Sequence, residues 1–92
     1  MSNIDWNKLV TQAMKDAALH AQQVELSTAE VLRLRKIADQ AVSDLQDAVD
    51  IDEASADEIA QLEAWKKYRV ALNRLPEQVG YPTVIDWPVV PI

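Results

Sequence analysis

Apolar side chains in the first quarter of the chain recur at steps of three and four residues, the spacing that places them on one stripe of an α-helix. The stripe consists of Trp6, Leu9, Ala13, Ala17, Ala21 and Val24. Ser2 or Asn3 can cap the start of such a helix, and Asp5 would then lie in its first turn, near the positive end of the helix dipole. The pattern predicts a first helix over residues 4–25.

A second helix is predicted from about residue 28 to residue 49. Ser27 and Glu30 have the spacing of a capping box, and Leu26 and Val31 can form the accompanying hydrophobic staple. The apolar residues then alternate steps of three and four through Val31, Leu34, Ala38, Ala41, Leu45 and Ala48. This seam can pack on a neighbouring helix at coiled-coil geometry, although fewer than three heptads are too few to assign a coiled coil.

A third helix is predicted over residues 56–75. The acids between Asp50 and Ala54 have no helical periodicity, and Ser55 and Glu58 then repeat the capping-box spacing. Two adjoining apolar stripes follow, one made of Ile59, Leu62, Trp65 and Leu72 and the other of Ala64, Tyr68, Ala71 and Leu75. A helix with so broad an apolar arc should contact its neighbouring helices and one further surface.

The last segment of the chain, residues 76–92, is rich in proline and β-branched residues. Pro76 ends the third helix, since proline lacks a backbone donor and restricts the residue before it. The later prolines and Gly80 exclude another helix of useful length and favour an extended path, folded back on the helices or added onto a partner. The sequence therefore predicts an all-α, three-helix protein with a helical hairpin and an extended Pro-rich C-terminal tail.

Length and composition indicate a single helical domain over residues 1–92. The chain has no phenylalanine, and many of its apolar positions are alanines, which cannot fill a deep core. We therefore expect a homo-oligomer or docking on a partner protein.

Charge is negative overall and unevenly distributed. The net charge of −6 argues against a nucleic-acid partner, because neutralising phosphates needs a basic face. Between Asp39 and Glu58 there are eight acids and no base, whereas Lys66 to Arg74 contains four bases and no acid. The patches can steer a partner or pair with one another, and they can equally form a solvated helical face.

Residues that could carry catalysis or bind a metal are scarce. The absence of cysteine excludes disulfides, thiolate zinc sites and cysteine nucleophiles. His20 has no second ligand at metal-binding helical spacing, and the acids Asp50 to Glu53 lack the glycine turn of a calcium loop. With no nucleophile elbow and no phosphate-binding glycine loop, we expect no enzyme, no cofactor and no metal.

No signal peptide and no membrane-spanning run is evident, so no membrane partner is expected and the cytoplasm fits best as the site of action.

The third predicted helix and the tail resemble the C-terminal end of bacteriophage (Caudovirales) tail fibre assembly proteins. The resemblance rests on Leu62, Trp65, Lys66, Tyr68, Arg69, Leu72 and Asn73, followed by Ile85, Trp87, Pro88 and Pro91. It covers roughly residues 40–92, and residues 4–18 also look like a segment of short phage tail assembly proteins. Many family members carry a larger N-terminal domain, so the resemblance implies that this chain would be a short form that matches their C-terminal region.

This resemblance implies a non-catalytic chaperone that binds the phage tail fibre protein and promotes its folding and trimerisation. It would act in the cytoplasm of the bacterial host, and some family members remain on the virion tail fibre. The alternative is a structural virion tail component or a self-assembling helical interaction module.

Seven residues are the candidates for partner binding, since aromatic side chains are the usual anchors of protein interfaces and a proline-bounded tail suits recognition. They are Trp65, Tyr68, Arg69, Tyr81, Ile85, Trp87 and Pro88. The competing interpretation is that these aromatics fill the core and pin the tail to it. The basic residues beside them could likewise pair with a partner or with acids of the second predicted helix.

Overall fold

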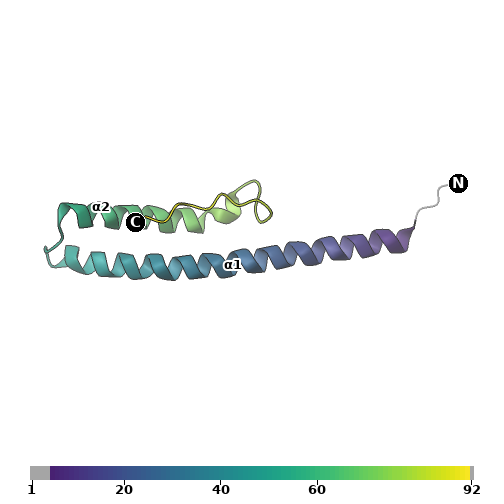
Figure 1. Ribbon diagram of the computed structural model, residues 1–92, viewed down its shortest axis with the longest axis horizontal. Coiled ribbons are helices and arrows are strands. Elements are labelled where there is room, and N and C mark those ends of the chain that lie inside the picture. The colour runs from purple at the N-terminus through teal and green to yellow at the C-terminus, as the bar shows by residue number, and fades with distance from the viewer. Residues whose placement is uncertain (1–4, 92) are drawn as a thin grey trace.

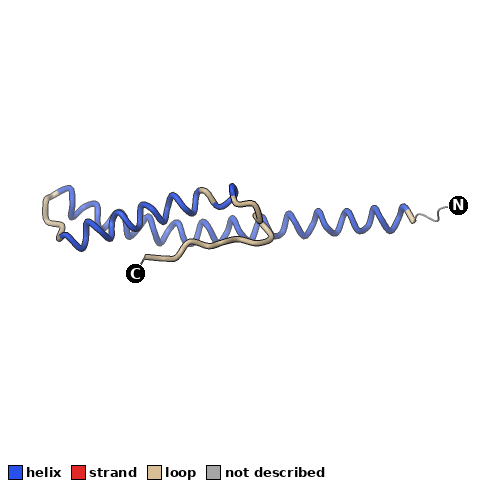
Figure 2. The backbone as a smooth tube through the Cα atoms, turned by 90° about the horizontal axis from the view of Figure 1, so that it is seen from above, coloured by secondary structure: helices blue, strands red, loops and turns tan. Residues whose placement is uncertain are grey.

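The computed structural model describes residues 5–91, which form two α-helices and no β-strand. These are α1 (Trp6–Asp50) and α2 (Ala56–Asn73), followed by a short 3-10 helix, η1 (Leu75–Glu77). The helix α2 lies antiparallel to the C-terminal half of α1 (Figure 1), and the segment after η1 runs back beside the helices (Figure 2). The all-α class is confirmed for the described residues, in a rod of 78 × 18 × 16 Å.

The helix α1 begins one residue after Asp5, whose carboxylate accepts a hydrogen bond from the Lys8 backbone amide at 3.1 Å. Asp5 is therefore the N-cap, and its predicted place inside the first turn was wrong. The reason is that a short carboxylate reaches the amide three residues on and satisfies a donor that the helix leaves unpaired. The predicted caps Ser2 and Asn3 and the predicted start at residue 4 lie outside the described residues.

The predicted division into three helices was wrong, because Trp6 to Asp50 form one continuous helix of 45 residues, α1, which runs through the predicted boundary between residues 25 and 28. The sequence around Ser27 contains neither glycine nor proline. Nothing there interrupts the backbone hydrogen bonds, so the amides that a capping box would satisfy already pair with carbonyls four residues earlier.

The Thr28 and Glu30 side chains of this stretch have other partners within α1. The Thr28 hydroxyl donates to the Val24 carbonyl at 2.8 Å, and Ser27 is buried. Glu30 accepts two hydrogen bonds from the Arg33 guanidinium, at 3.0 and 2.7 Å, and these hydrogen bonds lower the pKa of Glu30. The Thr28 hydroxyl and the Glu30 carboxylate thus remain hydrogen-bonded on a helix that continues through them.

The break predicted between Asp50 and Ala54 is confirmed, and so is the second capping box. Asp52 takes a left-handed conformation with φ of 57°, which aspartate tolerates better than most residues. The Ser55 hydroxyl accepts from the Glu58 amide at 3.2 Å, and the Glu58 carboxylate accepts from the Ser55 amide at 3.0 Å. The helix α2 then runs to Asn73, two residues short of the predicted end, and Pro76 lies in η1.

The core is small and lies where the two helices and the last segment meet. Its buried members are Ala38, Tyr68, Leu72 and Leu75. Half-buried side chains of α1, α2 and the last segment pack against it, namely Val31, Leu34, Trp65, Ile85 and Val90. The segment over residues 78–91, hereafter the tail, therefore closes one side of the helical hairpin.

Hydrogen bonds between a side chain and the backbone fix the first part of the tail as a loop. The Gln78 side chain donates to the Asp86 carbonyl and accepts from the Asp86 amide, both at 2.8 Å. Gly80 allows a close approach inside this loop, because a Cβ atom there would lie 2.7 Å from the carbonyl oxygen of Val84. The loop delivers Ile85 to the core, and no residue from 78 to 91 is in a helix or strand.

Replacing Leu72 by alanine should lower the free energy of unfolding by about 2–5 kcal/mol, since the side chain is 1% exposed and its loss leaves a cavity. The matched control is Val70→Ala in the same helix, where the side chain is 45% exposed and the expected loss is under about 1 kcal/mol. Urea unfolding followed by far-UV circular dichroism measures both. Equal losses would contradict the position of the core.

Candidate protein-binding surface

Two candidate residues of α2, Trp65 and Tyr68, meet edge to face, with ring centroids 5.8 Å apart and an interplanar angle of 90°. Tyr68 is 4% exposed and belongs to the core, whereas Trp65 is half-buried at its margin. The Tyr68 hydroxyl is buried without a hydrogen-bond partner among the described residues. Because the ring is buried, a partner could contact it only after opening the core. Tyr68 therefore packs beneath the surface residues and does not itself form the surface.

Arg69 joins the two helices, because its guanidinium lies 3.5 Å from the Asp39 carboxylate of α1. A second bridge runs from the Arg35 guanidinium, which donates to the Asn73 side-chain oxygen at 2.6 Å. Of the two pairings considered for the basic residues, Arg69 uses the one within the chain. Both its side chain and that of Asp39 remain partly exposed, so the pair is worth at most about 1 kcal/mol.

The tail candidates fall into two separate places. Ile85 and Trp87 line a depression of about 260 Å³ where the tail crosses α1, together with Leu26, Ser27, Pro82 and Thr83. Tyr81 lies in a different depression, of about 210 Å³, beside Leu72 and Pro76. Trp87 is 36% exposed and Pro88 is half-buried. The structure thus brings Ile85 and Trp87 together and leaves Tyr81 apart from them.

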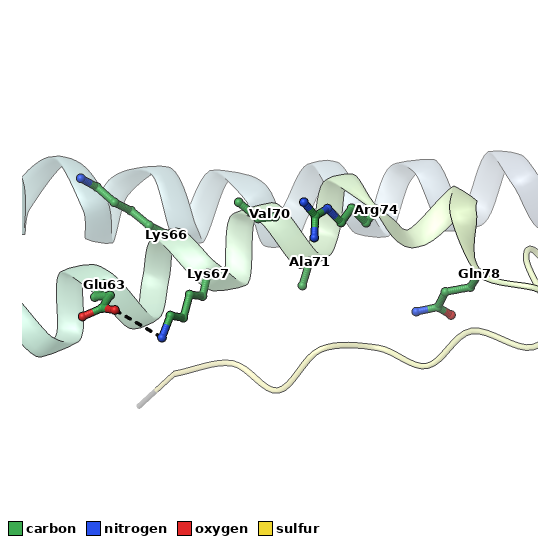
Figure 3. Close-up of a pocket in the computed structure, with 7 residues that line it drawn as sticks. All are labelled: Glu63, Lys66, Lys67, Val70, Ala71, Arg74 and Gln78. Carbon is green, nitrogen blue, oxygen red and sulfur yellow. Dashed lines mark ion pairs between the residues drawn. The ribbon is translucent and has the colours of Figure 1, made fainter.

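Between α2 and the tail lies a larger depression, hereafter the basic groove, with a volume of about 600 Å³ (Figure 3). It is lined by Glu63, Lys66, Lys67, Val70, Ala71, Arg74 and Gln78. Val70 and Ala71 give it an apolar floor, and its charged lining residues are three cations and one carboxylate. Sequence reasoning did not identify this groove, although the run of bases from Lys66 to Arg74 was a signal for it.

The charges of the basic groove are only partly neutralised within the chain. The Lys67 ammonium lies 3.3 Å from the Glu63 carboxylate. Lys66 and Arg74 form no ion pair within residues 5–91. An apolar floor with unneutralised cations at its edge suits a segment that carries both apolar side chains and carboxylates.

Metal-binding clusters and membrane-spanning helices are both absent from the described residues. No group of three or more histidine, aspartate and glutamate side chains in residues 5–91 is placed to hold a metal ion. Neither helix described here combines the length and the apolar character needed to cross a bilayer.

Comparison with known proteins assigns the family. The family described as "Caudovirales tail fibre assembly protein, lambda gpK" matches residues 3–92. The chain therefore belongs to the tail fibre assembly proteins of tailed bacteriophages, as the sequence resemblance indicated.

Curated relatives align over part of the chain. It is 45% identical over 58 residues to the prophage tail fiber assembly protein homolog TfaR of Escherichia coli K12, which covers 63% of this chain and 29% of that protein. It is 44% identical over 59 residues to the tail fiber assembly protein of Escherichia phage lambda, covering 64% and 29% respectively. A probable tail fiber assembly protein of Acyrthosiphon pisum secondary endosymbiont phage 1 is 46% identical over 54 residues, or 59% of this chain and 34% of that protein.

The alignments thus span about a third or less of each of these relatives. No solved structure matches the chain.

The unpaired hydroxyl of Tyr68 makes stability depend on pH in a defined direction. Burial raises the pKa of Tyr68, while neighbouring Arg33 opposes the rise and Glu30 adds to it. The unfolded chain therefore loses this proton at a lower pH than the folded protein does. The resulting stabilisation is fully present below the ordinary tyrosine pKa of about 10 and is lost as the pH rises through the higher folded value.

We expect Tyr68→Phe to leave the free energy of unfolding at neutral pH unchanged or slightly raised, since the variant removes an unpaired buried hydroxyl. Above about pH 10 the variant should lose less stability than the parent. Urea unfolding of both proteins at neutral and alkaline pH tests this. Identical alkaline losses would show that Tyr68 is not buried.

Proposed function

We propose that this protein is a non-catalytic chaperone that binds phage tail fibre protein in the cytoplasm of the bacterial host and promotes its folding and trimerisation. Its family supports an assembly role on tail fibres. The observation that carries the proposal is the basic groove beside a tail that presents Trp87 at the surface. The two are linked through Gln78, which lines the groove and is hydrogen-bonded to the backbone of Asp86, the residue before Trp87.

The need for such a chaperone follows from the folding of intertwined trimers. Pairing between distant segments and between three chains is slow, and unfinished chains expose apolar edges that aggregate. A binder with an apolar floor and a basic rim can shield such a segment without itself supplying a template for β-pairing, since residues 5–91 contain no strand. The seven candidate residues form the proposed contact, with Trp87 and Tyr81 touching the fibre and Tyr68 supporting them.

The test is co-expression of this chain with the tail fibre protein encoded beside it, followed by sizing of the soluble fibre. Soluble fibre trimers that form only in the presence of this chain are the expected result. Fibre that folds equally well without it would exclude the chaperone role. Stoichiometric retention of the chain on mature tails, with no effect on fibre folding, would instead favour a structural tail component.

Within that assay, the double variant Tyr81→Ala, Trp87→Ala should weaken fibre binding by at least about tenfold, because aromatic anchors carry much of the energy of protein interfaces. The matched control is Val89→Ala, which truncates a side chain of the same tail that is 89% exposed. Far-UV circular dichroism should show unchanged helicity in all three proteins. Binding that is equal in the double variant and the control would overturn the assignment of these residues.

The basic groove is tested by removing its unneutralised charge. Lys66→Gln with Arg74→Gln should weaken fibre binding and reduce the sensitivity of binding to salt, because screened attraction to carboxylates is lost. Lys8→Gln with Lys15→Gln makes the same change in net charge on the N-terminal half of α1 and should leave fibre binding as it is. Equal effects of the two double variants would show that only overall charge matters.

A further inference from the structure

The N-terminal part of α1, residues 6–22 and hereafter the arm, has no partner in the described chain. Every side chain in it is exposed, and α2 and the tail cover α1 only from Gln23 onward. Figure 1 shows the arm projecting beyond the hairpin. Trp6, Val10 and Met14 are each more than half exposed. Since an isolated helix of this length is marginal in water, the arm needs packing to be stable.

The seam that α2 covers continues into the arm without a change of phase. Within the hairpin, the seam residues of α1 alternate steps of three and four through Val24, Ser27, Val31, Leu34, Ala38, Ala41, Leu45 and Ala48, and all of them are buried or half-buried. The same alternation extends backwards through His20, Ala17, Ala13, Val10 and Trp6. The arm therefore presents a coiled-coil seam of the kind that is already covered further along the helix.

This seam is self-complementary when two copies run in opposite directions. The seam positions are symmetric about Lys15, so Trp6 faces Val24 of a second copy, Val10 faces His20, and Ala13 faces Ala17. The two alanines at the centre let the helix axes approach closely. A symmetric pair of this type uses the same surface on both subunits, as closed dimers do.

Charge on the arm is segregated away from the seam. Lys8 and Lys15 lie on the opposite face of the helix, and Asp16 is the one charged residue in or beside the seam between Trp6 and Val24. The Asp16 carboxylate already accepts a hydrogen bond from the Gln12 side chain at 2.9 Å. Two seams can thus meet with little charge to desolvate.

In the antiparallel pair, the N-terminal end of one arm lies beside the hairpin of the other copy. In the antiparallel pair, Trp6 of one copy lies at the level of Val24 of the other. The depression of about 260 Å³ lined by Leu26, Ile85 and Trp87 begins within one helical turn of that level. In a parallel pair the two arms would lie side by side with Trp6 facing Trp6, and neither arm would reach this depression. We infer that this protein forms an antiparallel dimer through its arms, in which Trp6 of each copy fills the depression beside Trp87 of its partner.

The inference does not rest on fibre binding, and it is tested on the purified chain. Sedimentation equilibrium should give a mass of twice the chain's 10.3 kDa at micromolar concentration. Ala17→Glu, in the seam, should raise the dimer dissociation constant at least about tenfold. Ala18→Glu, one residue away on another face and equally exposed, is the matched control and should leave it unchanged. A monomeric parent protein, or equal effects of the two variants, would overturn the proposal.

The relative direction of the two arms is tested by disulfide cross-linking, which is straightforward because the chain has no cysteine of its own. A mixture of the Ala13→Cys and Ala17→Cys variants should form disulfide-linked dimers on mild oxidation, and each variant alone should form far fewer, since the antiparallel pair places position 13 opposite position 17. Efficient cross-linking of each variant with itself would show a parallel pair and overturn the inferred geometry.

Discussion

Close packing of α2 on Ala38 is the contact on which the rest of the structure depends. Ala38 is completely buried, and its small side chain leaves the space that Tyr68, Leu72 and Leu75 fill. A hairpin of two helices cannot enclose these side chains on every side. Ile85 and Val90 of the tail close the open side, so the tail belongs to the core as well as to the surface. Recognition and stability are therefore coupled in the same segment.

Local sequence patterns predicted the helical class, the turn after Asp50 and the capping box at Ser55, and they failed at the identical spacing of Ser27 and Glu30. The difference lies in the flanking residues. Ser55 follows acids without helical periodicity, whereas Ser27 lies within an apolar repeat that continues on both sides. Each residue added to an existing helix gains one backbone hydrogen bond. An uninterrupted apolar repeat therefore continues the helix past a side chain that could have capped a new one.

The candidate surface was less predictable, because resemblance to a family does not distinguish residues that touch a partner from residues that hold the fold. Tyr68 and Arg69 are engaged within the hairpin, while Trp87 is partly free. The basic groove was not predicted because its floor is formed by Val70 and Ala71, which are not part of the recognised motif, and because its lining includes Gln78, whose position after η1 no local rule predicts. Its lining residues, however, recur at steps of three and four residues, from Glu63 through Lys67 and Ala71 to Arg74.

The pairing of Gln78 with Asp86 gives the tail a particular chemical vulnerability. The amide group is neutral, so its two hydrogen bonds to the backbone do not weaken with salt or with moderate changes of pH, unlike the ion pairs elsewhere. Hydrolysis of that one amide to a carboxylate would replace the donor by an acceptor and set it against the Asp86 carbonyl. Loss of this one amide would thus open the loop between Gln78 and Asp86 and leave the tail held to the core by the packing of Ile85 and Val90.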